Sequence, residues 1–250
     1  MSTVTLGNGL LGTEMNRQTG WDVVARSREH LACDARFDIT QPKTFAPYLL
    51  ESGEDGRPVP KYSHAVNCIA YTDTYSEDSA LHWDVNYQGV NHLIEFCNTW
   101  NIVLVHISTD YLYSNAIEFA SERDVPVHCR TWYGYTKLLA DGLVQLASAE
   151  YLLIRATHKR IPFQYAQAWT TQTGNFDYVT VISEIIIELI EKGARGLYNV
   201  GTETKTMYEL AKRTKHDVMP AQSKANENTP TNTTMDTTKL YTFLAQSRHV

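Results

Sequence analysis

The sequence predicts an α/β protein built around a parallel sheet. Short apolar segments rich in β-branched residues, typical of buried strands, alternate with longer helical patterns. A glycine-rich turn also follows the first of these segments directly, as is common where a strand leads into a helix. Near-continuous apolar strands separated by helices indicate a doubly wound sheet that is covered on both faces. The strand-like segments are "TVTLG" (3–7), "WDVVAR" (21–26), "HAVNCIA" (64–70), "WNIVLVHIS" (100–108) and "EYLLIRA" (150–156).

The helical segments follow from apolar residues at spacings of three and four. The clearest pattern covers residues 79–100, and a second helix is expected over 134–148. Toward the C-terminus, the sequence predicts a helix over 181–193 that ends at a glycine, a strand over 196–201 and a helix over 206–214.

Two segments lack either pattern. Residues 52–63 combine prolines, glycines and charges, which predicts a surface loop. Residues 221–240 are polar and contain few apolar side chains. They are interpreted either as a disordered tail or as a loop that lies over the domain surface.

The composition of the 250 residues is that of an ordinary globular protein, with 43% hydrophobic and 20% charged residues. A net charge of −6 argues against a nucleic-acid partner bound by a general basic field. We find neither an apolar run long enough for a membrane span nor a signal peptide, and we expect a cytoplasmic protein with no membrane partner. Cys33, Cys68, Cys97 and Cys129 do not form a metal-binding or redox spacing, so no metal site is expected.

The turn "GNGLLG" places three glycines between the first strand and a helix. Glycines there permit a tight turn and let a pyrophosphate approach backbone N–H groups at the helix N-terminus. The alternative is a glycine-rich turn without a ligand, but the alternating elements favour a dinucleotide site. No Lys-Ser or Lys-Thr follows in "GLLGTE", which excludes a P-loop triphosphatase. The predicted cofactor-binding residues of this turn are Gly7, Asn8, Gly9, Leu10, Leu11 and Gly12.

The end of the second strand bears on which dinucleotide binds. An acidic residue there would bond the ribose hydroxyls of NAD, whereas this chain has Arg26, Ser27 and Arg28. Guanidinium groups and a hydroxyl suit the 2′-phosphate of NADP, although either arginine is also consistent with a solvated strand end. NADP is therefore the predicted cofactor, with NAD as the alternative.

Hydroxyl groups and a lysine cluster at the carboxyl end of the predicted sheet, where open α/β sheets bind their ligands. The stretch "VHISTDYLYS" puts Thr109 at the end of the fourth strand. In "WYGYTKLL", Tyr133 and Lys137 lie one helical turn apart on the same face. Together with the glycine turn, these residues predict a nicotinamide-dependent active site.

At these residues the chain resembles the extended short-chain dehydrogenases/reductases, and among them most closely the dTDP-4-dehydrorhamnose reductase family. The resemblance implies a Rossmann-type doubly wound parallel sheet, with an NAD(P)-binding domain over 1–156 and a small C-terminal substrate-binding lobe over 157–250 that is interleaved with the last elements of the core. It also implies an NADPH-dependent reductase of a nucleotide-linked 4-keto-6-deoxy sugar. Further matching stretches are "FDIT" (37–40), "VNCIAYT" (66–72), "VNYQGVNHL" (85–93), "GLYNVG" (196–201) and "PTNTTMDTTKL" (230–240).

The resemblance also implies individual roles. Thr109 would hydrogen-bond the substrate carbonyl, Tyr133 would donate the proton, and Lys137 would contact the nicotinamide ribose and lower the pKa of Tyr133. A nearby ammonium stabilises a phenolate, which makes the phenol a better general acid. The remaining implied positions are Asp38 and Ile39 at the adenine, Ala70 and Tyr71 at the middle of the cofactor, Asn86 supporting the site or merely packing, and Asp110, Tyr111 and His158 at the substrate.

The chain departs from the family in one stretch, and alternatives stay open. "RATHKRIPF" carries His158, Lys159 and Arg160 where rhamnose-forming members have an aromatic residue, a cluster that suits either a sugar diphosphate or a solvated loop. Asp110 is followed by Tyr111 and not by glutamate, which argues against a dehydratase. An epimerase or a non-catalytic NADP-binding regulatory subunit remains an alternative, and the helices at 79–100 and 134–148 are candidates for forming a homodimer.

Overall fold

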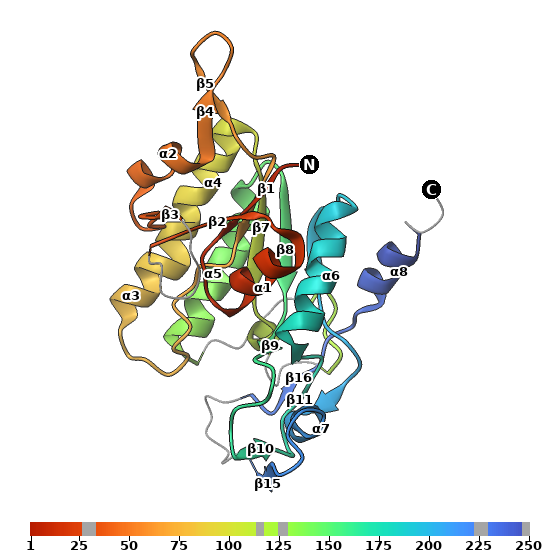
Figure 1. Cartoon of the computed structure of the whole chain (residues 1–250). Coiled ribbons are helices and arrows are strands. Elements are labelled where there is room, and N and C mark those ends of the chain that lie inside the picture. The colour runs from red at the N-terminus through yellow and green to blue at the C-terminus, as the bar shows by residue number, and fades with distance from the viewer. Residues whose placement is uncertain (27–33, 114–117, 125–129, 223–229, 247–250) are drawn as a thin grey trace.

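A seven-stranded parallel sheet forms the centre of the protein in the computed structural model, which describes residues 1–26, 34–113, 118–124, 130–222 and 230–246 (Figure 1). The strand order is β13-β8-β7-β6-β1-β2-β3, and every neighbouring pair is parallel. The chain builds outward from β1 in both directions, which confirms the predicted doubly wound sheet. The strands are β1 Thr3–Leu6, β2 Asp22–Ala25, β3 Asp34–Ala35, β6 His64–Asn67, β7 Val103–Ser108, β8 Tyr151–Arg155 and β13 Gly196–Asn199.

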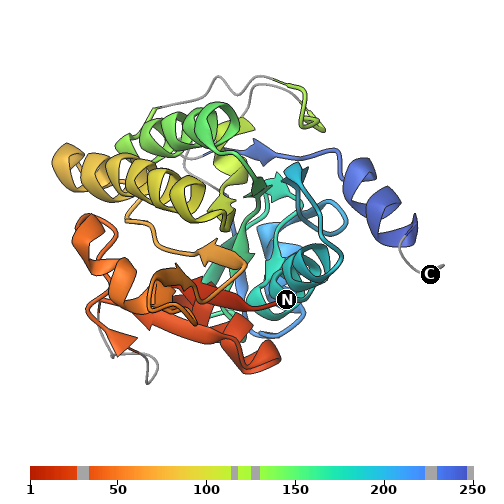
Figure 2. The same cartoon turned by 90° about the horizontal axis from the view of Figure 1, so that it is seen from above.

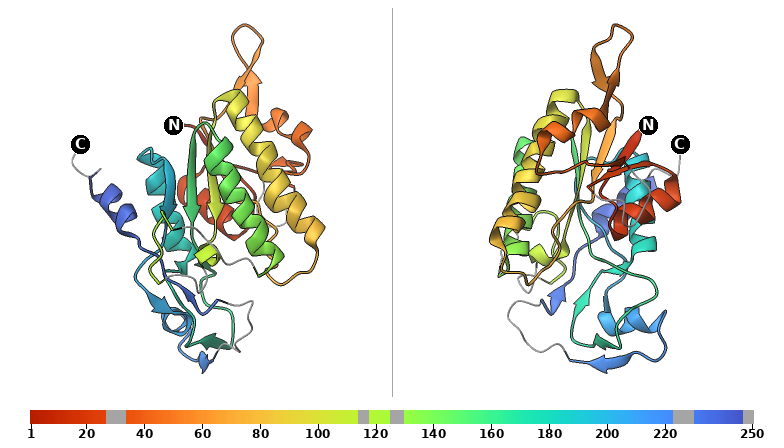
Figure 3. Two further views of the ribbon diagram at one scale, coloured as in Figure 1. Left: turned by 180° about the vertical axis from the view of Figure 1, so that it is seen from behind. Right: turned by 60° about the vertical axis from the view of Figure 1, so that its left-hand side comes forward.

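Helices cover both faces of this sheet (Figures 2 and 3). On one face, α1 (Leu10–Thr19) packs beside α6 (Val179–Glu191). On the other, α4 (Gly89–Trp100) packs beside α5 (Trp132–Ala147). Each face has its own apolar core, which explains why the strands are apolar on both sides. The core residues include Val90, Leu93, Ile94, Ala140 and Val144 on the α4–α5 face, and Leu11, Met15, Ile182 and Ile186 on the α1–α6 face.

The helix predicted over 79–100 is divided into three parts. α3 (Ser79–Trp83) is followed by a π-helical turn, η2 (Asp84–Gln88), and then by α4. Within the turn, the buried Asn86 side chain accepts a hydrogen bond from the backbone N–H of Tyr71 at 2.8 Å and donates one to its carbonyl at 3.1 Å. The π-helical turn therefore coincides with the residue that anchors the segment after β6, and such turns often mark functional sites.

The remaining predicted helices are confirmed, with small shifts at their ends. α5 begins two residues before its prediction, where the Thr131 hydroxyl accepts a hydrogen bond from the N–H of Gly134 at 3.1 Å. Gly193 follows α6 with a φ of 70°, as expected of a glycine that ends a helix. α7 (Met207–Lys212) begins with a capping box formed by Thr206 and Glu209.

The predicted surface loop is exposed, but it is an antiparallel hairpin and not a loop. β4 (Leu50–Ser52) pairs with β5 (Pro58–Pro60), after the short helices η1 (Pro42–Thr44) and α2 (Ala46–Leu49). The prolines are tolerated because β5 is an edge strand and a missing N–H can face solvent. The hairpin projects from the end of the molecule opposite the small sheets and α7, which are described next (Figure 1).

Three small sheets and α7 gather beyond the carboxyl ends of β7 and β8 (Figures 1 and 3). The last helix, α8 (Thr238–Gln246), returns to the core and buries Leu240 and Leu244. Residues 230–240 are therefore not a disordered tail, and the domain division after residue 156 stays a prediction. Within the described residues, no helix is long and apolar enough to cross a membrane. The small strands are β9 His158–Lys159, β10 Gln167–Trp169, β11 Thr173–Gly174, β12 Asp177–Tyr178, β14 Lys205–Thr206, β15 Met219–Ala221 and β16 Asn232–Thr233.

A buried ion pair joins α5 to the end of β8. Arg155 Nε donates to Asp141 Oδ2 at 2.7 Å, and both side chains are at most 2% exposed. The guanidinium also donates to the hydroxyl of Tyr113. Because charges buried this deeply are tolerated only when paired, this contact fixes the position of α5 relative to the strand ends.

We expect Asp141→Asn to destabilise the fold, because it leaves the Arg155 guanidinium buried without an opposing charge. The free energy of unfolding should fall by about 3–5 kcal/mol in urea denaturation. Glu150→Gln is the control, since it removes the exposed Glu150–Arg195 pair at 3.1 Å, which should contribute less than about 1 kcal/mol. Equal stability of the two variants would contradict the role given to the buried pair.

Candidate active site

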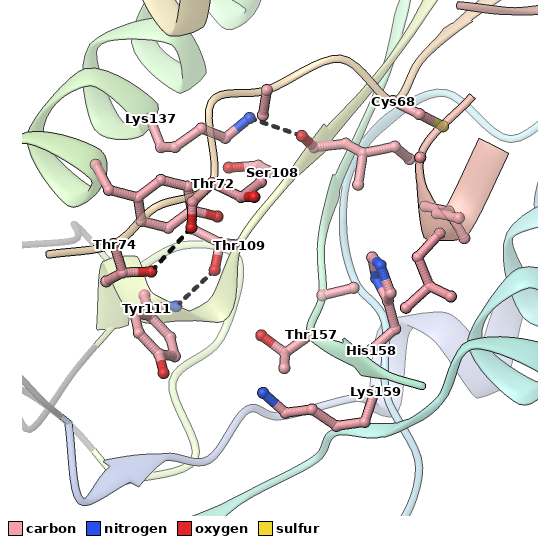
Figure 4. A pocket seen from close by; sticks show the side chains of 17 residues that line it. Cys68, Thr72, Thr74, Ser108, Thr109, Tyr111, Lys137, Thr157, His158 and Lys159 are labelled. Carbon is pink, nitrogen blue, oxygen red and sulfur yellow. Dashed lines mark hydrogen bonds between the residues drawn. The ribbon is translucent and has the colours of Figure 1, made fainter. Parts of the chain in front are cut away.

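Two adjoining cavities lie over the carboxyl ends of the central strands. The first, of about 410 Å³, is surrounded by residues that follow β1, β6, β7 and β8 (Figure 4). The second, of about 380 Å³, extends toward β2. Gly9, Cys68 and Ala70 line both cavities, so they form one cleft. The cleft lies where the chain order reverses between β1 and β6, which is the usual binding position in doubly wound sheets.

Each of the three glycines in the turn after β1 is suited to its position for a different physical reason. Gly7 has a φ of +100°, a conformation that other residues rarely adopt. A Cβ on Gly12 would lie 2.0 Å from the Gly7 carbonyl oxygen, so α1 packs on the turn only with glycine there. A Cβ on Gly9 would meet nothing within 4 Å, because this residue borders the open cleft.

The N-terminus of α1 is suited to an anion. Among the described residues, no side chain caps the helix, and its first turn contains no acidic residue. Backbone N–H groups at the start of a helix can bind an anion, and the helix dipole favours a negative charge there. The turn therefore fits the pyrophosphate of a dinucleotide.

The second cavity contains several of the predicted cofactor residues. Arg26, Asp38, Ile39, Ala70 and Tyr71 all line it. The carboxylate of Asp38 accepts hydrogen bonds from the N–H and the hydroxyl of Thr40, at 2.9 and 2.8 Å, which stiffens this wall.

Asn86 does not line this cavity. Asn86 lies behind the wall and supports Tyr71, as described above. Ser27 and Arg28 lie outside the described residues.

Thr109 reaches the first cavity from the end of β7. Its hydroxyl accepts a hydrogen bond from the N–H of Tyr111 at 3.3 Å. Tyr111 and His158, the other predicted substrate residues, also line this cavity. Asp110 does not line it; the carboxylate is fully buried and accepts a hydrogen bond from the Thr157 hydroxyl, which ties the end of β7 to the end of β8. A direct contact of Asp110 with substrate stays a prediction.

Tyr133 lines the first cavity at the beginning of α5. The pKa of Tyr133 is raised to about 12, chiefly by burial; the Thr109 hydroxyl acts to lower it, and the carboxylates of Asp110 and Asp141 act to raise it. The direction is the reverse of the sequence-based expectation, because the cost of burying a phenolate outweighs the stabilising contacts. At neutral pH the phenol therefore keeps its proton.

Lys137 lies one turn further along α5 and is 2% exposed. Its Nζ donates to the Ile107 carbonyl at 2.8 Å and lies 3.2 Å from His106 Nε2. Burial lowers the pKa of Lys137 to about 8, against the opposing effects of Asp141 and Cys68. An amine with such a pKa changes protonation close to neutral pH, where proton transfer is most useful.

Thr157 and Lys159 also lie on the wall formed after β8 (Figure 4). Thr157 was not assigned from the sequence, whereas Lys159 belongs to the basic cluster for which the sequence left open either a sugar diphosphate or a solvated loop. Burial lowers the pKa of the Lys159 amine, and Asp110 opposes this. Burial lowers the pKa of the neighbouring His158 to about 4, so its imidazole is neutral at neutral pH. Lys159 is thus the cationic side chain on this wall, opposite Thr109 and Tyr133.

The structure also contains a buried polar pair that sequence reasoning missed. Asn67 and His106 lie on neighbouring strands behind Lys137, and both are 0% exposed. The sequence did contain a signal for this pair, because each of the two otherwise apolar strands carries one of these polar residues.

Comparison with known proteins is consistent with these observations. The family model described as the RmlD substrate binding domain matches residues 1–158. A curated dTDP-4-dehydrorhamnose reductase from Mycobacterium tuberculosis is 26% identical over 216 residues, which are 77% of this chain and 66% of that relative. The chain thus spans just under two thirds of the length of that relative.

Solved structures share the fold. A dTDP-4-dehydrorhamnose reductase from Bacillus anthracis, in complex with NADP, superposes with a TM-score of 0.75 at 20% identity, covering 96% of this chain and 92% of that one. MoeE5 in complex with UDP-glucuronic acid and NAD has a TM-score of 0.75 at 18% identity, covering 98% and 93%. The family model matches more than half of the residues of this chain, so the chain belongs to the RmlD substrate binding domain family.

Proposed function

We propose that this protein is an NADPH-dependent reductase of a nucleotide-linked 4-keto-6-deoxy sugar, of the dTDP-4-dehydrorhamnose reductase type. The observation that carries the proposal is that Thr109, Tyr133 and Lys137 come together in one cavity. That cavity continues into the cleft with the glycine turn. Membership of the RmlD substrate binding domain family supports the same reaction.

The cleft offers a site for each part of a dinucleotide. The backbone at Gly9 and the N-terminus of α1 suit the pyrophosphate, and Asp38 and Ile39 border the space for the adenosine. Arg26 suits the 2′-phosphate of NADP, with NAD as the alternative cofactor. When bound, the reduced nicotinamide supplies the hydride for the ketone carbon.

The protein supplies the proton and its placement. Thr109 donates a hydrogen bond to the substrate carbonyl, and Tyr133 protonates the oxygen as negative charge develops there. A pKa of about 12 keeps the phenol protonated at neutral pH, and the alkoxide formed from a ketone is a much stronger base than a phenolate. The transfer from Tyr133 is therefore favourable once hydride has been received.

The wall after β8 suits the substrate. The ammonium of Lys159 points into the cavity (Figure 4), where it would attract the diphosphate of a nucleotide sugar. The neutral imidazole of His158 lies in the stretch where rhamnose-forming members have an aromatic residue, and its flat ring would suit contact with the sugar.

Tyr133→Phe is expected to lower kcat by about 10²–10⁴-fold, because it removes the general acid. The measurement is NADPH oxidation with and without dTDP-4-keto-6-deoxy-L-mannose. Tyr135→Phe is the matched control on the same helix, since Tyr135 is 40% exposed and should leave turnover unchanged. Full turnover by Tyr133→Phe would place the proton donor elsewhere. Tight NADPH binding by the parent protein, with no turnover of any ketosugar, would favour a regulatory subunit.

Gly9→Ala tests the dinucleotide site. Its Cβ meets no protein atom within 4 Å, so stability should be unchanged, whereas the methyl group would occupy the space of the pyrophosphate. We expect NADPH binding, followed by fluorescence titration, to weaken by about 10-fold or more. Gly142→Ala in α5, where a Cβ is equally unhindered, is the control and should retain affinity. Unaltered affinity in Gly9→Ala would remove the phosphate site from this turn.

Lys159→Met tests the substrate wall. Loss of the cation should raise KM for the nucleotide sugar by about 10-fold, by analogy with other charge-assisted contacts, and leave NADPH affinity unchanged. Arg160→Met is the control, because this neighbouring side chain is exposed and does not line the cavity. An equal rise in KM for both variants would indicate a general effect of charge and not a contact.

A further inference from the structure

We propose that Asn67 and His106 act as a positioning pair that favours the neutral amine of Lys137 over its ammonium form. Because the ammonium form of Lys137 is the one that would assist Tyr133 as general acid, the pair would thereby set the upper pH limit of the reaction. This extension rests on the proposed function. The state of Lys137 itself is measurable without any turnover.

The orientation of the Asn67 amide is fixed by the backbone. The N–H of Ile69 donates to Asn67 Oδ1 at 3.0 Å, so the oxygen faces the segment after β6. The Asn67 NH₂ group therefore faces His106, with Nδ2 at 3.1 Å from the ring Nδ1. An amide NH₂ group only donates, so His106 Nδ1 has to be the acceptor.

This contact decides the tautomer of His106. A neutral imidazole that accepts at Nδ1 carries its proton on Nε2. Nε2 lies 3.2 Å from Lys137 Nζ, so its N–H points at the lysine nitrogen. A neutral amine has a lone pair to accept this hydrogen bond, whereas an ammonium has none.

The neutral amine satisfies the rest of the network as well. Lys137 Nζ donates to the Ile107 carbonyl at 2.8 Å and can accept from His106 at the same time. With an ammonium, two donors would face each other in a buried site. If the Asn67 amide were turned over, its NH₂ group would face the Ile69 N–H, and two donors would again meet. If His106 carried its proton on Nδ1 instead, that N–H would face the Asn67 NH₂ group. Burial and Lys137 both hold the pKa of His106 well below its usual range, which also disfavours an imidazolium.

Other groups around Lys137 act in the opposite direction. Asp141, on the same helix, and the Cys68 thiol, after β6, both favour the ammonium. The effect of Asp141 is partly offset because its carboxylate is paired with Arg155. Tyr133 stays a neutral phenol at neutral pH and adds no charge. Burial is the largest effect against the ammonium, and the donor conflict with His106 acts in the same direction.

The direct test is a pH titration of Lys137 in the protein, monitored through the NMR signal of its ¹³C-labelled Cε. The signal is assigned by its absence in Lys137→Met. The parent protein should titrate near pH 8. His106→Gln presents an acceptor oxygen toward Nζ and should move the midpoint to about pH 9 or above. Asn67→Asp, which accepts from Nδ1–H and so reverses the tautomer, should move it in the same direction. His64→Gln is the control, because His64 is a buried histidine at the other end of β6 and contacts Arg195.

The outcomes separate this inference from the proposed function. Unchanged midpoints in folded His106→Gln and Asn67→Asp, or a parent midpoint at the usual lysine value of about 10.4, would overturn the inference. Shifted midpoints with a matching rise in the upper limit of the pH–rate profile would support both claims. Shifted midpoints without any ketosugar turnover would leave the pair intact and contradict the reductase.

Discussion

The shared direction of the seven strands is the constraint on which the site depends. Because all of them are parallel, their carboxyl ends meet at one edge, and the residues that follow β1, β6, β7 and β8 line one cleft. The reversal of chain order between β1 and β6 leaves room there for a ligand. The buried contact between Arg155 and Asp141 then holds α5 against the same edge, so that Tyr133 and Lys137 face Thr109.

Those parts of the fold that depend on local pattern were predictable. Apolar runs, helical spacing and the glycine turn gave the order of the main strands and helices. The π-helical turn was not predictable, because it coincides with a contact between Asn86 and the distant backbone of Tyr71. The strands of the C-terminal lobe contain only two or three residues, too few to show a period, and they pair across long stretches of sequence.

The candidate site likewise has features that were predictable from the sequence and features that were not. Thr109, Tyr133 and Lys137 were predictable because their positions at a strand end and a helix start determine where they lie. Their protonation was not predictable, because it depends on burial: the pKa of Tyr133 is raised and that of Lys137 is lowered. The burial of Asp110 was not predictable for a related reason, since its carboxylate joins two strand ends that are distant in sequence.

Direct transfer of hydride to a sugar is the central claim, and isotope transfer tests it most directly. The protein would be incubated with NADPH deuterated at both C4 positions and dTDP-4-keto-6-deoxy-L-mannose, and the sugar product analysed by mass spectrometry and NMR. The account predicts a single deuterium at the former carbonyl carbon. A sugar without deuterium at that carbon, whether or not cofactor is consumed, would contradict it.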